Sequence, residues 1–309
     1  MGLSEFIKLY RDFYTNDEIL FEMLKSTKNK ELALINPNFT IRCMYASSIK
    51  FLKWNINEFG AFNQNMSNFY FSLANVNNMP VFSFNRNLRQ EQQEKFNPEF
   101  EKYVTGFDMF IDLDKNQVPE PNKMILKRLG LKSPDLKTYI KAYLIKDMKR
   151  LKEVFDENKI PYSIRFSGSG FHFVINDKYL PNYSVNDKVK FCKNFAFDLK
   201  NWFAVDSIDL SIYDLRRLAK IPYTIDIKTG NVCMPLDDKQ AENFDYNDYY
   251  VANLVNSSFR GRGLLIRNDD NNNKNFLKLV EYMGVKAEYP LNQNKNGDEV
   301  NVSSGVYKQ

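Results

Sequence analysis

Two aspartates in an apolar run offer the clearest chemistry in this sequence. Asp112 and Asp114 stand in the run Phe-Ile-Asp-Leu-Asp. The side-chain period of a strand is two residues, so on a strand both carboxylates point to the same face of the sheet. Two carboxylates held that close repel each other unless a cation lies between them, and Mg²⁺ prefers such oxygen ligands. A bare pair is more often a solvated surface feature, but the apolar flanks favour a central strand.

A short turn rich in Ser and Gly lies downstream, in the run Arg-Phe-Ser-Gly-Ser-Gly-Phe-His-Phe at 165–173. Backbone N–H and hydroxyl groups in such a turn are good donors to phosphate oxygens. His172, the only histidine of the chain, follows two residues after Gly170. Hairpins need glycine in any case, and a single histidine can be a hydrogen-bonded core residue. Taken alone, the turn leaves both interpretations open.

The third segment, 207–230, combines a carboxylate with spaced cations. Asp209 is followed by Arg217, Lys220 and Lys228. A carboxylate with cations at this spacing could complete a metal site and bind a triphosphate. By itself the segment could equally be an ion-paired surface.

The elements around these residues are predicted from hydrophobic periodicity. Apolar and β-branched residues at 104–113 predict a strand, and 162–175 predicts a hairpin with a glycine-containing turn. Apolar residues at helical spacing predict amphipathic helices at 139–158 and 186–204. Another strand is expected near 221–227. This order indicates an α/β (α+β) fold with a largely antiparallel sheet, close to βαββαβ.

Together, the three motifs resemble the signature of the archaeo-eukaryotic primase superfamily. That family combines an hDhD strand (h for hydrophobic), an SGxxGxH-like turn, and a later hD followed by RLxRxPxSxxxKTG. Met44-Tyr45-Ala46-Ser47-Ser48 also looks like the Tyr-x-Ser region of primase small subunits. The resemblance is strong over about 105–236 and faint before it. Its counterparts here are Ile111-Asp112-Leu113-Asp114, Ser167-Gly168-Ser169-Gly170-Phe171-His172, Ile208-Asp209, Arg217-Leu218-Ala219-Lys220-Ile221-Pro222-Tyr223-Thr224 and Lys228-Thr229-Gly230.

The resemblance implies a primase catalytic fold with an RRM-like βαββαβ palm and an N-terminal mixed α/β portion. One catalytic domain is expected. The polar end of the chain, poor in apolar residues, predicts disorder. The expected bounds are 1–285 for the whole domain, 1–104 for its N-terminal portion, 105–236 for the core, 237–285 for the C-terminal flank and 286–309 for the disordered tail.

The resemblance also implies roles for single residues. Asp112, Asp114 and Asp209 would hold two Mg²⁺ or Mn²⁺ ions. Asp206 competes with Asp209, which is preferred because its distance to Arg217 better matches the family. Triphosphate binding is expected from the turn and the cations, namely Arg165, Ser167, Gly168, Ser169, Gly170, His172, Arg217, Lys220 and Lys228.

The implied activity is that of a DNA primase or primase-polymerase, which makes primers on a single-stranded DNA template from NTPs or dNTPs. A large primase subunit or a helicase would be the protein partner. A primer-extending repair polymerase or a CRISPR-associated polymerase is the alternative within the superfamily. A non-catalytic RNA-binding module is less favoured, because paired carboxylates on its sheet would repel a phosphate backbone. The glycine turn is one residue shorter than the commonest primase form.

Composition narrows the class of protein. The 309 residues carry a net charge of +5, which suits contact with phosphates but is too mild to prove it. Cys43, Cys192 and Cys233 are scattered and accompany one histidine, so we expect no structural zinc and a reducing interior. No apolar run reaches about 18 residues, so no membrane association is expected. The expected location is intracellular, cytoplasmic or nucleoid-associated.

Overall fold

The structure is a computed structural model, and it describes most of the chain. No helix in the described part is long and apolar enough to cross a membrane. Residues 45–47 of the Tyr-x-Ser motif and the predicted tail 286–309 lie outside the described residues. The described residues are 2–36, 39–44, 48–56, 66–80, 91–92, 95–132, 135–257, 259, 261, 266–268 and 274–284.

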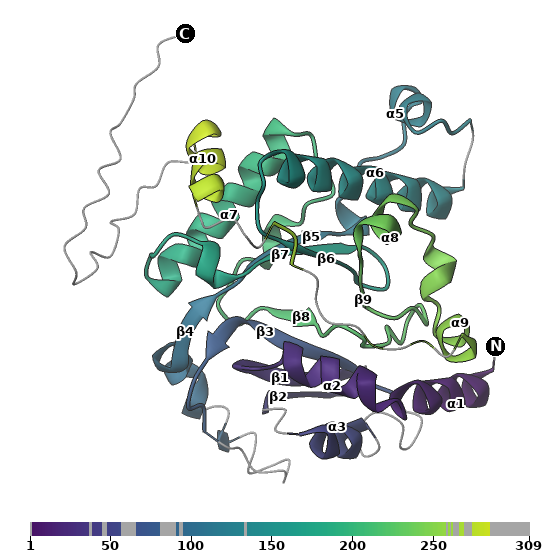
Figure 1. Cartoon of the computed structure of the whole chain (residues 1–309), viewed down its shortest axis with the longest axis vertical. Helices are drawn as coiled ribbons and strands as arrows, with labels where there is room; N and C mark the ends of the chain where they lie inside the picture. Colours follow the sequence, from purple (N-terminus) through teal and green to yellow (C-terminus); the bar gives the residue numbers. More distant parts are fainter. Residues whose placement is uncertain are drawn as a thin grey trace.

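Two antiparallel sheets form the centre of the molecule (Figure 1). The first has the order β2-β1-β3-β4, and β8 also pairs with β3; the second has the order β5-β7-β6-β9. The strands of the first sheet are β1 (Lys30–Asn36), β2 (Phe39–Met44), β3 (Asn68–Val76), β4 (Val104–Phe107) and β8 (Leu218–Lys220). Those of the second are β5 (Met109–Leu113), β6 (Ser163–Phe166), β7 (Phe171–Ile175) and β9 (Met234–Pro235).

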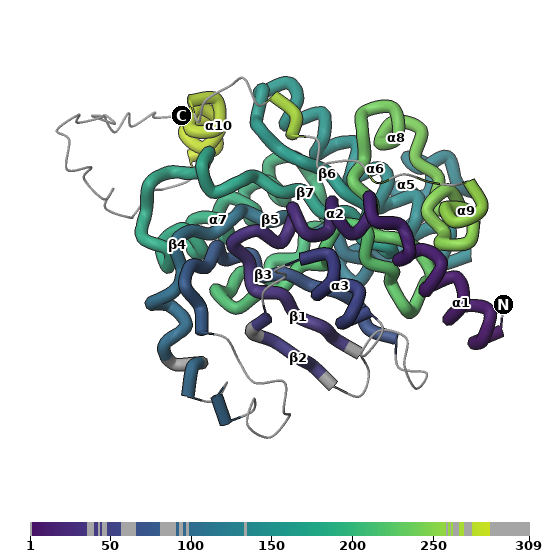
Figure 2. Tube along the Cα trace, turned by 60° about the horizontal axis from the view of Figure 1, so that its bottom comes forward, coloured from purple at the N-terminus to yellow at the C-terminus, as the bar shows by residue number. Residues whose placement is uncertain are grey.

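Helices cover the outer faces of the two sheets. The long helices α6 and α7 lie over the second sheet (Figure 1), whereas α1 to α3 lie beside the first (Figure 2). Asp135 caps α6 by accepting a hydrogen bond from the Thr138 N–H at 3.0 Å. The helices are α1 (Leu3–Tyr14), α2 (Asp17–Ser26), α3 (Ile49–Asn55), α5 (Lys123–Arg128), α6 (Leu136–Glu157), α7 (Val185–Trp202), α8 (Asp238–Glu242), α9 (Val251–Asn256) and α10 (Lys274–Tyr282).

The apolar run at 104–113 forms two strands rather than the single strand predicted. β4 belongs to the first sheet and β5 to the second, and the chain passes between them at Asp108. The Asp108 N–H donates to the Leu73 carbonyl at 3.1 Å. Its buried carboxylate accepts from Lys30 Nζ at 2.8 Å and from the Asp177 N–H at 2.9 Å. These long-range partners divide the run, and no local pattern shows them.

The order β5, α6, β6, β7, α7 agrees with the predicted βαββα order, and the hairpin is confirmed. The predicted strand at 221–227 is wrong. That segment turns at Tyr223, whose φ is 70°, and makes one isolated bridge between Ile225 and Val232. Beside β5, opposite β7, lies instead the segment after α7, where Ile208 bridges Leu113.

Candidate active site

Backbone hydrogen bonds bring the three predicted carboxylates together at the end of β5. The Asp209 N–H donates to the Asp112 carbonyl at 2.9 Å, and the Asp114 N–H donates to the Ser207 carbonyl at 2.9 Å. The antiparallel bridge between Leu113 and Ile208 lies between these two bonds. The aspartates are therefore neighbours through main-chain pairing, although about a hundred residues separate the two segments.

The electrostatics of this group are those of crowded negative charges. Burial, and after it the nearby carboxylates of Asp114 and Asp209, raise the pKa of Asp112 to about 7. Lys220 and Arg217 act in the opposite direction on the pKa of Asp112. A cation bound between the carboxylates would relieve this repulsion.

The donor set fits a hard divalent ion, because it consists of carboxylate oxygens. In the part of the chain that the structure describes, however, no three His, Cys, Asp or Glu side chains form a group that could hold a metal. Asp114 Oδ1 accepts from the Asn116 N–H at 2.7 Å, and Asp209 Oδ1 accepts from the Ser211 N–H at 2.9 Å. Each of these two carboxylates keeps its second oxygen for a ligand. The three are thus electrostatically coupled, yet they are not closed around a common point.

The competing aspartate, Asp206, points elsewhere. Its Oδ2 accepts from the Tyr143 hydroxyl of α6 at 2.5 Å. The next residue is also held by α6, because Asp147 Oδ2 accepts from the Ser207 N–H at 2.8 Å and from Ser207 Oγ at 2.7 Å. The geometry therefore favours Asp209 as the third carboxylate.

Sequence reasoning missed Asp147, which is fully buried. Burial raises the pKa of Asp147, although Lys146 and Ser207 oppose that change. A signal was present in the sequence, because Asp147 lies four residues before the buried Leu151 on the apolar face of the predicted helix. An acid on such a face needs a partner, and here the partner is the segment that carries Asp209.

His172 lies across from Asp112 in the β5–β7 pair, and its Nε2 is 3.6 Å from Asp112 Oδ1. Its ring packs at 4.6 Å from the ring of Phe110. Burial lowers the pKa of His172 well below its usual value, and the charges of Arg165 and Lys220 lower it further, so the imidazole is neutral. Among the described residues, none hydrogen-bonds to its Nδ1. The ring both packs in the core and faces the carboxylates.

Arg165 is the second strand neighbour of His172 and is only 2% exposed. Its guanidinium lies 5.4 Å from the ring centroid of Phe71, which belongs to the first sheet. Within the described ranges its Nε and Nη1 have no hydrogen-bond partner. Buried donors without partners are costly, and an anion is the ligand that would satisfy them.

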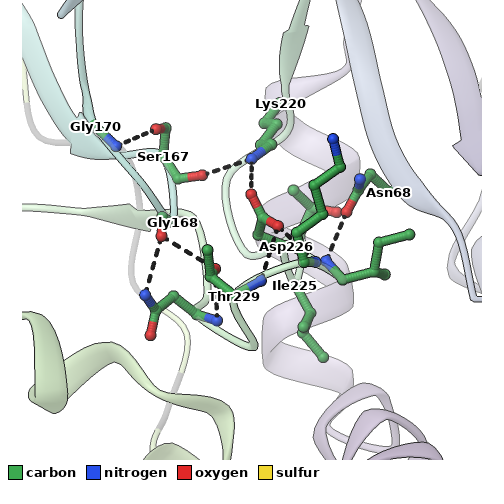
Figure 3. Close-up of polar contacts among 12 residues, drawn as sticks. Asn68, Ser167, Gly168, Gly170, Lys220, Ile225, Asp226 and Thr229 are labelled. Carbon is green, nitrogen blue, oxygen red and sulfur yellow. Dashed lines mark hydrogen bonds and ion pairs between the residues drawn. The ribbon is translucent and has the colours of Figure 1, made fainter. Parts of the chain in front are cut away.

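The predicted glycine turn is closed by its own hydrogen bonds (Figure 3) and packs on the end of β5. The Ser167 N–H donates to the Gly170 carbonyl at 2.9 Å, and the Gly170 N–H donates to Ser167 Oγ at 3.0 Å. A Cβ on Gly170 would lie 2.2 Å from the Leu113 carbonyl oxygen, so only glycine allows the turn this close to the aspartates. Gly168 has a φ of 94°, which also favours glycine.

Lys220 and the loop after it hold this turn in place (Figure 3). Lys220 Nζ donates to the Ser167 carbonyl at 3.0 Å and forms an ion pair with Asp226. Asp226 Oδ1 also accepts from the backbone N–H of the next loop residues, with Lys228 at 2.8 Å. Thr229 Oγ1 donates to the Gly168 carbonyl at 3.1 Å. Although burial opposes it, Asp226 keeps the pKa of Lys220 above its ordinary value.

The remaining predicted residues contribute unequally. Arg217 is half-buried, and its charge acts on Asp112. Ser169 is half-buried within the turn. Lys228 has an exposed side chain, and its backbone N–H rather than its ammonium contacts Asp226. Asp226, like Asp147, was not predicted from the sequence.

Comparison with known proteins gives no match to a family model and no significant match among curated proteins. Among solved structures, the polymerase domain of Mycobacterium tuberculosis ligase D in complex with DNA is 10% identical, with a TM-score of 0.46, and the match covers 84% of this chain and 90% of that one. The AEP domain of the cyanophage S-2L primase-polymerase is also 10% identical, with a TM-score of 0.36, and covers 72% and 89%. With TM-scores below 0.5, neither likeness carries an activity over to this chain.

Proposed function

We propose that this protein is a metal-dependent nucleotidyltransferase of the primase-polymerase type, which synthesises primers on single-stranded DNA. The observation that carries the proposal is the meeting of Asp112, Asp114 and Asp209 beside His172 and the glycine turn. Residues from all three motifs of the sequence resemblance therefore lie in the same region of the fold. Chance surface aspartates would have no reason to adjoin buried cationic donors.

The carboxylates would hold one or two Mg²⁺ or Mn²⁺ ions, which would stabilise charge on the attacking and leaving oxygens of the phosphoryl group. Asp112 must lose its proton before it can serve as a ligand, and its pKa of about 7 makes that step sensitive to pH near neutrality. Asp114 and Asp209 already accept one backbone hydrogen bond each, which restrains both side chains.

The triphosphate would lie on the side of the site where donors lack partners. Arg165 offers two buried guanidinium N–H groups, and neutral His172 can donate one ring N–H. Lys220, held charged by Asp226, adds a third donor group. Hydrogen bonds to phosphate from such buried donors are charge-assisted and orient the nucleotide for in-line attack.

One assay tests the proposal. The protein is incubated with a single-stranded template, Mg²⁺ or Mn²⁺ and labelled NTPs or dNTPs, with and without a primer, beside an Asp112→Asn control. Product without primer supports a primase, and extension of the added primer alone supports the repair or CRISPR-associated alternative. No metal-dependent incorporation under any of these conditions would refute a nucleotidyltransferase.

A further inference from the structure

Residues 115–137, which we name the basic arm, form a segment rich in cations. It contains six Lys and Arg residues and two Asp and Glu residues. The rest of the chain therefore holds 37 Lys and Arg against 36 Asp and Glu. The arm therefore carries +4 of the net charge of +5, and the remainder is almost neutral. Its cations are Lys115, Lys123, Lys127, Arg128, Lys132 and Lys137.

All six cations are exposed, and none makes an ion pair with any residue that the structure describes. Of the two acids in the arm, Asp135 is engaged in capping α6, because its carboxylate accepts from the N–H and the hydroxyl of Thr138 at 3.0 and 2.7 Å. Some exposed cations elsewhere do have partners, for example Arg150 with Glu153 at 2.7 Å and Lys25 with Glu22 at 2.8 Å. The charge of the arm is thus left for an external anion.

The described residues of the arm, 115–132 and 135–137, are held in the fold by specific hydrogen bonds. Asn122 caps α5 by accepting from the Met124 and Ile125 N–H groups at 3.1 and 3.0 Å. At its base, the Tyr139 hydroxyl of α6 donates to the Pro119 carbonyl at 2.8 Å. Figure 1 shows α5 beyond the N-terminal end of α6, outside the two sheets. Helical spacing puts Lys123 and Lys127 on the same face of α5.

The arm also begins where the candidate active site ends. Asp114 caps the short helix Lys115–Gln117, which is the first part of the arm. The arm is therefore continuous along the chain with the strand that carries the carboxylates. A second cation-rich stretch, residues 138–152, has the same excess of +4. Three of its cations, Lys146, Arg150 and Lys152, form ion pairs with acids, which distinguishes it from the arm.

From these observations we propose that the basic arm is the surface that binds the phosphate backbone of single-stranded nucleic acid. This inference rests on the proposed function and deepens it, because it states where the template or primer strand is held. Binding is electrostatic and independent of sequence, so it should weaken as salt rises.

The test compares two triple variants with the same change in charge. The arm variant is Lys123→Gln, Lys127→Gln and Arg128→Gln, in which glutamine preserves helix propensity. The control is Lys25→Gln, Lys102→Gln and Arg150→Gln, three exposed cations that each pair with an acid three residues away. The full-length proteins are titrated into a labelled single-stranded oligonucleotide at several NaCl concentrations, and fluorescence anisotropy gives the affinity.

For single strands, log K falls with log salt by about 0.7 per phosphate contact. Loss of three contacts should reduce that slope by about 2 and weaken binding on the order of tenfold or more at low salt. The control should keep the slope of the parent. Equal affinity and slope in parent and arm variant would overturn the proposal, and so would equal losses in both triple variants.

Two further measurements separate the alternatives. Binding to anionic phospholipid vesicles that is lost in the arm variant while oligonucleotide binding persists would make the arm a membrane surface and refute the proposal. Incorporation of nucleotides is measured in parallel. If the arm variant alone loses strand binding but the parent shows no incorporation under any condition, the arm binds nucleic acid and the proposed function is refuted. If the parent incorporates nucleotides but the arm variant binds the strand as well as the parent does, only the proposal for the arm is refuted.

Discussion

At the scale of single residues, the site depends on carboxylates whose ligand role has a measurable consequence. We expect Asp112→Asn and Asp114→Asn to abolish nucleotide incorporation, because metal-linked charge stabilisation contributes several kcal/mol to the transition state. Circular dichroism and melting temperature should remain those of a folded protein. Activity within about tenfold of the parent in either variant would contradict the assignment.

The third carboxylate can be identified by a matched pair of variants. Asp209→Asn should be as damaging as Asp112→Asn, because Asp209 pairs with the β5 backbone and influences the pKa of Asp112. Asp206→Asn should be mild, because Asp206 faces α6 rather than the other carboxylates and an asparagine oxygen can still accept from the Tyr143 hydroxyl. Rates measured at saturating Mg²⁺ check this ranking. The opposite ranking would show that Asp206, three residues earlier, is the third metal ligand.

The pKa of Asp112 predicts a dependence of stability on pH. Because its folded pKa of about 7 lies above the ordinary value of an aspartate, the folded state keeps a proton that the unfolded state releases. The resulting stability is complete below about pH 4 and is lost as pH rises through about 7. In EDTA, Asp112→Asn should therefore melt at a higher temperature than the parent. This difference in melting temperature should be larger at pH 8 than at pH 5. A difference that does not change with pH would argue against a strained carboxylate.

At the scale of elements, the sequence predicts what local periodicity controls. The hairpin β6–β7 and the helices α6 and α7 appear where apolar spacing and the glycine turn predict them, within a few residues. Local pattern is sufficient for these elements.

What could not be predicted depends on partners distant in sequence. The turn at Tyr223, where a strand was expected, is held by the Tyr14 hydroxyl of α1, which donates to the Tyr223 carbonyl at 3.3 Å and accepts from the Ile225 N–H at 3.0 Å. Asp226 has a role because Lys220, which it pairs with, donates to the distant glycine turn at Ser167. No window of neighbouring residues contains that information.

Helix α6 should act on the reaction through Asp147. Asp147→Ala leaves the Ser207 N–H and hydroxyl without their buried partner, which costs about 1–3 kcal/mol. If that free energy is lost by displacing the segment that carries Asp209, metal binding should weaken by the same amount. The Mg²⁺ concentration for half-maximal rate should then rise roughly 5- to 150-fold. Asp147→Asn keeps an oxygen acceptor and should restore most of the loss. A lower melting temperature with an unchanged Mg²⁺ requirement would reduce Asp147 to a packing role.

At the scale of the whole molecule, the two sheets are joined at Asp108. The buried ion pair with Lys30 connects the strand passage to the first sheet, and the hydrogen bond from the Asp177 N–H connects it to the end of β7. Asp108→Asn should destabilise the protein by about 3–5 kcal/mol, because it leaves the buried Lys30 ammonium without its counter-charge. Urea unfolding measures this change.

The control is Glu99→Gln, which breaks an exposed pair with Lys102 and should change stability by less than about 1 kcal/mol. Incorporation by Asp108→Asn should follow the fraction of molecules that remain folded. Equal stability of the two variants would show that the joint between the sheets does not depend on this charge.

The sharing of one edge of β3 by two strands has a consequence for synthesis on the ribosome. β4 pairs with Ala74 to Val76, whereas β8 pairs with Tyr70 to Ser72. Since β8 is made roughly 150 residues later, the nascent chain carries an unpaired strand edge through about half of its translation. Lys220 ends β8, so the same late event that closes this edge also delivers a cation to the site. The newborn protein is therefore exposed to aggregation for as long as it lacks that cation.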